Sequence, residues 1–244
     1  MVKFFESTFS YDYQWPAVTL AYFLRYPNPY STHVVSTDTL DMHIDPISGN
    51  LHITRLHLKR GKLPKTVARF IPKIKESYIL EKSVVDTRHQ TLSTETRNLD
   101  WNGVLSVVEN QVYTPDPSAK STSAATHWAP GSVFTSPAAT LVKTVVKFES
   151  KLGAARRERT EERRGWLGNW TAGMGGVRGT IELVGKSSMK DGIQRSREGM
   201  KIVLEQLRER GLVRIVKEQR QGGWERWKKV WRGEGQGVDG GEMI

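Results

Sequence analysis

The sequence predicts an α+β fold in which a curved, seven-stranded antiparallel sheet has one face covered by a long C-terminal helix. Two observations carry this prediction. Apolar and polar residues alternate in seven separate segments, as in strands that bury one face. A single amphipathic segment, residues 181–210, is long enough to form a helix that covers such a sheet.

The strands follow one another at the spacing of an antiparallel meander. A turn sequence at residues 45–50 separates the second strand from the third, so these two are expected to form a hairpin. The seven strands are expected at residues 3–13, 34–44, 51–59, 78–86, 92–99, 104–113 and 141–148.

Two helices are predicted besides the segment discussed below. Residues 15–26 read as three helical turns, with Pro16 at the first helical position and Pro27 disfavouring continuation. The 181–210 helix is expected to end at Gly211, because glycine readily adopts the left-handed conformation that closes a helix. Its apolar stripe comprises Ile181, Val184, Ile193, Met200, Val203, Leu204 and Leu207.

Composition divides the chain into one domain, residues 1–210, and a basic Gly- and Trp-containing tail, residues 211–244. Within the domain, two stretches read as inserts. Residues 115–137 are rich in Pro, Ser, Thr and Ala, and residues 154–179 are rich in Arg and Glu and then in Gly.

The net charge of +11 is concentrated near the C-terminus, where residues 195–233 carry twelve basic and five acidic residues. Such an excess suits nucleic acid, an anionic bilayer or an acidic protein partner, although a solvated basic helix is the simplest explanation. A nucleic-acid-binding protein is one hypothesis, because Trp224, Trp227 and Trp231 lie among basic residues and could stack on bases.

Catalytic and metal-binding motifs were not found. The chain has no cysteine, and its six histidines show no metal-ligand spacing. Residues 173–176 lack the glycine spacing of a dinucleotide-binding turn, and neither a nucleophile elbow nor a P-loop occurs. We therefore expect no enzyme activity, no catalytic residue, no cofactor and no metal.

Residues 61–75 combine apolar residues at three- and four-residue steps with five cations and no acid. This pattern predicts a short basic amphipathic helix that acts as a lid and contacts an anionic membrane surface. An ordinary crossover helix packed on the sheet is the alternative. The residues expected to form the lid and membrane contact are Leu63, Pro64, Lys65, Val67, Arg69, Phe70 and Ile71.

Several motifs, in order along the chain, resemble the PRELI-like family of mitochondrial intermembrane-space phospholipid transfer proteins. The resemblance covers about residues 1–114, 141–153 and 180–210. Its motifs are Arg25-Tyr26-Pro27-Asn28-Pro29 with His33, Thr54-Arg55-Leu56, Lys59-Arg60-Gly61-Lys62-Leu63-Pro64, Ser83-Val84-Val85-Asp86, Thr96-Arg97-Asn98-Leu99 and Gln194-Arg195-Ser196-Arg197-Glu198-Gly199-Met200.

The resemblance implies a lipid cavity inside the curved sheet, closed by the long helix. It implies a carrier that moves phosphatidic acid between the outer and inner mitochondrial membranes and supports cardiolipin synthesis. Phosphatidylserine transfer by the same fold is the alternative. The resemblance also implies a small helical partner with twin cysteine motifs, which would supply import and stability. It argues against nucleic acid as a ligand.

By motif matching, the resemblance places the lipid headgroup at Arg25, His33, Lys59, Lys62 and Arg195. Arginine and lysine suit a phosphate that must be sheltered from water. Each residue also has a simpler explanation. Arg25 could close its own helix, His33 could bond to backbone on a strand face, and the remaining three could be surface charges. The chain departs from the family at Ser188 and Gly192, where Lys186 or Lys190 could compensate.

Overall fold

The computed structural model describes residues 2–60, 76–100, 105–118, 138–150, 171–214 and 216–217. For residues 2–3, 105, 150 and 171–190 it describes the backbone only. The predicted lid, Lys62, and residues 119–137, 154–170 and 218–244 lie outside the described residues. The expectations for the lid and membrane contact, for most of both inserts and for most of the tail therefore stay predictions.

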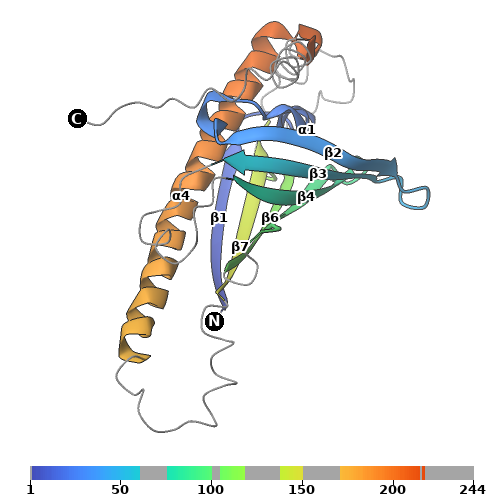
Figure 1. The fold of residues 1–244 in the computed structure, drawn as a ribbon. Helices are drawn as coiled ribbons and strands as arrows, with labels where there is room; N and C mark the ends of the chain where they lie inside the picture. Colours follow the sequence, from blue (N-terminus) through green and yellow to red (C-terminus); the bar gives the residue numbers. More distant parts are fainter. Residues whose placement is uncertain are drawn as a thin grey trace, which may run out of the picture.

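The fold class is confirmed, because seven antiparallel strands form one sheet in the order β1-β7-β6-β5-β4-β3-β2. Strands β2 to β7 form a meander, and β7 then pairs with the N-terminal strand β1, leaving β1 and β2 as edges. The sheet is strongly curved (Figure 1). Its strands are β1 Val2–Tyr11, β2 Val34–Ile44, β3 Leu51–Arg60, β4 Glu76–Asp86, β5 Thr91–Asn98, β6 Leu105–Pro115 and β7 Thr140–Ser150.

Helix α1, Trp15–Leu24, connects β1 to the rest of the sheet and ends two residues before the predicted position. The following 3-10 turn η1, Pro29–Ser31, is capped by Asn28, whose side-chain oxygen accepts a hydrogen bond from the Tyr30 amide at 2.9 Å. The Asn28 amide nitrogen donates to the Arg25 carbonyl at 2.6 Å. Asn28 therefore fixes the chain where it leaves α1.

Helix α4, Thr171–Arg210, begins ten residues earlier than predicted. It therefore includes residues 171–179, which we had assigned to the second insert. The predicted end is confirmed, since Gly211 has a φ of +74° and its amide donates to the Leu207 carbonyl at 3.1 Å. Helix α4 runs beside the curved sheet (Figure 1), and no helix among the described residues is long and apolar enough to cross a membrane.

The core lies where the C-terminal part of α4 meets α1 and the sheet. Met200, Val203, Leu204 and Leu207 are buried there against α1 residues such as Val18. Fully burying side chains of this size stabilises the fold by about 1.5–3 kcal/mol each. This end of the interior is closely packed with side chains, so any space for a ligand must lie farther toward the N-terminus of α4.

Candidate functional site

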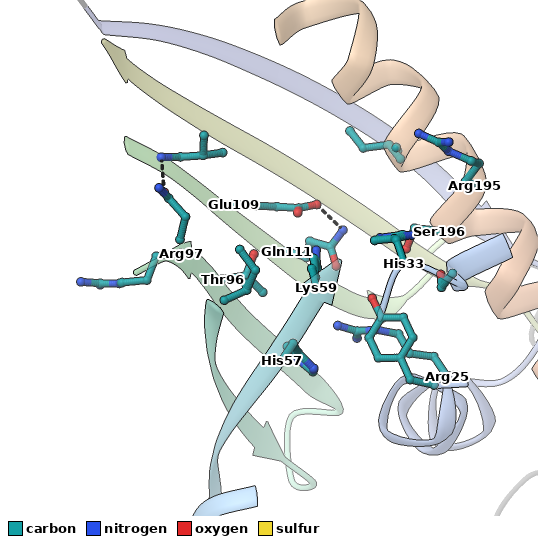
Figure 2. Close-up of a pocket in the computed structure, with 17 residues that line it drawn as sticks. Arg25, His33, His57, Lys59, Thr96, Arg97, Glu109, Gln111, Arg195 and Ser196 are labelled. Carbon is teal, nitrogen blue, oxygen red and sulfur yellow. Dashed lines mark hydrogen bonds between the residues drawn. The ribbon is translucent and has the colours of Figure 1, made fainter. Parts of the chain in front are cut away.

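A cavity of about 360 Å³ lies next to this core, between the sheet, the segment that follows α1, and α4 (Figure 2). Strands β3 to β6 contribute one wall, and residues 192–196 of α4 contribute another. Ile79, Val107 and Ile193 form apolar parts of the lining. Its ionisable and polar lining includes Arg25, His33, His57, Lys59, Arg97, Glu109, Gln111 and Arg195.

Four of the five residues predicted for headgroup binding line this one cavity: Arg25, His33, Lys59 and Arg195. They come from four different parts of the chain, and only the fold brings them together. The fifth, Lys62, lies outside the described residues. Gly192 also lines the cavity, and a Cβ atom added there would meet no atom within 4 Å.

Arg25 forms part of the floor of the cavity and is buried, with 7% of its surface exposed. Its Nη2 donates to Glu81 Oε2 at 2.6 Å, and its Cζ lies 3.7 Å from the centroid of the Tyr22 ring. Its Nη1 is also 3.5 Å from the Tyr22 carbonyl, so the helix-closing role that we considered is partly present. Arg25 Nε is buried without a hydrogen-bond partner among the described residues.

Glu81 on β4 is completely buried and holds two arginines at once. Besides the Arg25 contact, Glu81 Oε1 accepts from Arg55 Nε at 2.8 Å and from Arg55 Nη2 at 2.5 Å. Burial alone would raise the pKa of Glu81, but the nearby Arg25 and Arg55 charges and the His57 hydrogen bond hold this pKa well below its usual value. Glu81 is therefore a carboxylate, and it balances only one of the two guanidinium charges.

His57 completes this floor cluster, defined as Arg25, Arg55, His57 and Glu81. Its Nε2 is 3.1 Å from Glu81 Oε2, and its Nδ1 is 2.9 Å from the Thr37 hydroxyl. An ionised carboxylate only accepts hydrogen bonds, so we assign the proton to Nε2 and let Nδ1 accept from Thr37. Burial lowers the pKa of His57, outweighing the opposite effect of Glu81, so the ring is neutral and the cluster keeps one net positive charge.

We did not predict from the sequence that Arg25 lies in a cluster with Glu81, Arg55 and His57. A signal was present: Arg55 and His57 occupy alternate positions of β3, and Arg55 is the direct cross-strand partner of Glu81. Residues that face each other across antiparallel strands point to the same side of the sheet. A predicted β3–β4 register would therefore have suggested the Arg55–Glu81 pair.

A second group of basic residues, the rim cluster of His33, Lys59 and Arg195, lines the same cavity. No hydrogen bond or ion pair of the Lys59 side chain occurs among the described residues. Among the described residues, the Arg195 side chain donates only to the Asp191 carbonyl, from Nε at 3.3 Å. Partial burial, followed by the charges of Lys59 and Arg195, lowers the pKa of His33. An anion in the cavity would relieve this mutual repulsion.

One acid, Glu109 on β6, faces these cations, and the sequence analysis did not identify it. Its Oε1 accepts from Gln111 Nε2 at 2.9 Å, as Figure 2 shows. Burial raises the pKa of Glu109, while the charge of Lys59 opposes the shift. In the described residues no group of three or more potential ligands could hold a metal ion. The chemistry of the cavity is therefore that of an anion site that contains one acid.

Comparison with known proteins identifies the family of this chain. Residues 16–153 match the model of the PRELI-like family. The chain is 32% identical over 209 residues to the Saccharomyces cerevisiae protein UPS1, mitochondrial, covering 86% of this chain and 97% of the yeast protein. It is 45% identical over 95 residues to the Schizosaccharomyces pombe ups1 homolog, covering 39% of this chain and 54% of that one.

A third relative is the human PRELI domain-containing protein 1, mitochondrial, which is 36% identical over 115 residues, or 46% of this chain and 52% of the human protein. The family match spans more than half of the chain, and the similarity to the yeast protein covers almost the whole length of that protein. On this evidence the chain belongs to the PRELI-like family of mitochondrial lipid transfer proteins.

Proposed function

We propose that this lipid transfer protein carries phosphatidic acid between the outer and inner mitochondrial membranes and thereby supports cardiolipin synthesis. The observation that supports it best is the convergence of Arg25, Lys59 and Arg195 on one cavity. A bare phosphate loses its hydration there, and closely placed cations and donors can replace it. The net positive charge of the floor cluster adds to the attraction.

The acyl chains are the other half of the ligand. The resemblance implies a lipid cavity closed by the long helix, but Met200, Leu204 and Leu207 of that helix are packed against the core and leave no room for the chains there. The apolar part of the cavity lining, formed by Ile79, Val107 and Ile193, is a better route for them. We propose that the chains leave the headgroup along this wall, toward the part of α4 before residue 192.

The proposed working state is a peripheral one in the intermembrane space. The predicted lid at residues 61–75 would meet the anionic mitochondrial membrane surface, where each basic residue contributes about 1 kcal/mol. A small helical protein with twin cysteine motifs is the proposed partner. Membership of a lipid transfer family argues against the nucleic-acid hypothesis for residues 195–233.

Phosphatidylserine transfer is the second candidate, and Glu109 is the observation that favours it. A carboxylate in the cavity could pair with the ammonium group of a serine headgroup. The rim cations would then bind the phosphodiester and Glu109 the amine. The two candidates share the fold and differ in the headgroup, so a transfer assay separates them.

The test is lipid transfer between liposomes by the full chain with its small partner. We expect phosphatidic acid to move faster than phosphatidylserine or phosphatidylcholine. Arg195→Ala should lower the affinity for phosphatidic acid on the order of tenfold, because hydrogen bonds to charged groups contribute about 1.5–3 kcal/mol. Arg208→Ala is the matched control, since Arg208 is exposed on the same helix and does not line the cavity. Equal rates for all three lipids would contradict the proposed specificity.

A further inference from the structure

Glu109 is unexpected in a cavity built for an anion, because an ionised carboxylate repels a phosphate. Its position is nevertheless fixed by a chain of hydrogen bonds along β6. The Tyr113 hydroxyl donates to Gln111 Oε1 at 2.7 Å, and Gln111 Nε2 donates to Glu109 Oε1 at 2.9 Å. Tyr113 itself is buried, and its ring packs edge-on against Tyr22, with the centroids 5.4 Å apart.

The order of donors and acceptors in this series of hydrogen bonds determines which oxygen of Glu109 can meet a ligand. A neutral tyrosine hydroxyl that donates to the Gln111 oxygen turns the amide so that its nitrogen faces Glu109. Oε1 of Glu109 thus accepts its hydrogen bond from the amide nitrogen of Gln111. The second carboxyl oxygen carries no hydrogen bond from any described residue and remains available to a ligand in the cavity that Glu109 lines (Figure 2).

The charged surroundings of Glu109 come from several elements. Lys59 on β3 and Arg25 after α1 lower its pKa, whereas Glu81 on β4 and burial raise it, and burial has the largest effect. Arg195 on α4, His33, and Arg97 on β5, which pairs with Glu95, line the same cavity. Glu109 is half-buried and has no ion pair among the described residues, so its protonation can respond to a ligand.

We infer that Glu109 is a specificity-determining residue that distinguishes a phosphate monoester from a phosphate diester by sharing one proton with the monoester. This inference rests on the proposed function. A monoester has a second ionisation with a pKa near 6, so it can bring or accept a proton at neutral pH. The proton lies between a phosphate oxygen and the free oxygen of Glu109, and the pair then carries one negative charge fewer.

A phosphodiester has no such second ionisation. Its one charge is permanent, and its oxygens are weak bases, so Glu109 would have to take up a proton from solvent with little help from the ligand. When Glu109 stays ionised, two negative charges face each other in a partly dry cavity, and like charges so placed disfavour binding strongly. The same cations that attract both phosphates therefore retain the monoester selectively.

The experiment measures the affinity of the full chain, with its partner, for two short-chain lipids that are dispersed as monomers. Dihexanoyl phosphatidic acid is the monoester, and dihexanoyl phosphatidylglycerol is an anionic diester without an amine. In Glu109→Gln we expect the affinity for the diester to rise on the order of tenfold while that for the monoester changes little. The preference should therefore fall about tenfold, and monoester binding should take up fewer protons, as calorimetry in two buffers reveals.

The glutamine variant keeps the shape and the acceptor for Gln111, and removes a half-buried acid, so it should fold at least as well as the natural chain. Glu76→Gln is the matched control, because Glu76 is exposed and pairs with Arg60 outside the cavity. Gln111→Met removes the donor that orients Glu109 and should lower the preference in the same direction by a smaller factor.

The outcomes separate the two proposals. An unchanged ratio of monoester to diester affinity in Glu109→Gln overturns the inference and leaves phosphatidic acid transfer standing. A natural chain that binds neither lipid overturns the proposed function and the inference with it. A selective loss of dihexanoyl phosphatidylserine binding in Glu109→Gln also overturns the inference, because Glu109 would then recognise an amine.

Discussion

The floor cluster and the rim cluster carry the same sign of charge on the same cavity, yet they are built differently. In the floor, Arg25 and Arg55 share Glu81 and lie beneath aromatic rings, with Arg55 Cζ 4.9 Å from the centroid of Phe23. In the rim, neither Lys59 nor Arg195 has an ion pair among the described residues, and Arg195 donates a hydrogen bond to a backbone carbonyl of its own helix.

This difference teaches that lining a cavity and binding a ligand are separate properties of a cation. The floor charges are needed by the fold, because a buried carboxylate and its guanidinium partners stabilise one another only as a set. Lys59 and Arg195 in the rim have no ion pair among the described residues and repel each other, so they gain most from an anionic ligand. We therefore expect floor substitutions to change stability first and rim substitutions to change affinity first.

The largest expected effect is the loss of Glu81. Glu81→Ala leaves Arg25 and Arg55 buried without their carboxylate, and removing one partner of a buried ion pair costs about 3–5 kcal/mol. The free energy of unfolding, measured by denaturant titration of the chain with its partner, should fall by that amount. Glu76→Ala, which breaks the exposed pair with Arg60, should cost less than about 1 kcal/mol. Equal losses in the two variants would contradict the claim that the fold depends on the floor cluster.

The sequence predicted most of the sheet because each strand has its own two-residue alternation. Strand β2, for example, has the predicted bounds, since a turn follows it directly at residues 45–50. The predicted start of α4 was wrong because glycine has a low intrinsic helix propensity, and the first turns of the helix contain Gly173, Gly175, Gly176 and Gly179. Local propensity is a weak signal when the helix continues from a well-packed segment, here the one that contains Met200 and Leu204.

The candidate site could be predicted only in part. Arg25, His33, Lys59 and Arg195 were identified from motifs, because each is near in sequence to other characteristic residues. Glu81 and Glu109 have no such local signal. Their importance arises from pairing across strands and from the cavity wall, and those depend on register and curvature rather than on neighbouring residues.

A smaller effect on stability is expected where Gly199 of α4 packs against Asn28, close to Arg25 of the floor cluster. A Cβ atom at Gly199 would lie 2.7 Å from Asn28 Oδ1 and 2.9 Å from its Nδ2, and both of these atoms are already hydrogen-bonded to backbone beside Arg25. Gly199→Ala should therefore destabilise the fold by about 1–3 kcal/mol, the usual cost of overpacking. Gly192→Ala meets open space and should stabilise α4 by up to about 1 kcal/mol. Thermal unfolding of both variants checks the opposite signs, and an unchanged stability in Gly199→Ala would show that the contact with Asn28 is unimportant.

The smallest expected effect is the share of His57, the histidine of the floor cluster, in the pH dependence of the free energy of unfolding. Because burial lowers the pKa of His57, the unfolded chain binds a proton at this residue more readily than the folded chain does. Its contribution to stability is therefore complete above the unfolded pKa of about 6.5 and is lost as the pH falls below that value, by at most about 1.4 kcal/mol for each pH unit. The lowered pKa of His33 acts in the same direction, the raised pKa of Glu109 in the opposite one, and Glu81 adds its own loss only below about pH 4.3.

Replacing His57 isolates its share of this pH dependence. His57→Gln keeps an N–H donor for Glu81 but does not titrate, so the free energy of unfolding should fall less between about pH 7 and 5.5 than it does in the natural chain. His43→Gln serves as the control, because His43 is exposed and pairs with Asp41 at the surface. An unchanged slope in His57→Gln would mean that the pKa of His57 is the same in the folded and the unfolded chain. A steeper slope would mean that His57 is protonated in the fold. Glu81 would then balance a third positive charge, and the floor would attract an anion more strongly than the rim does.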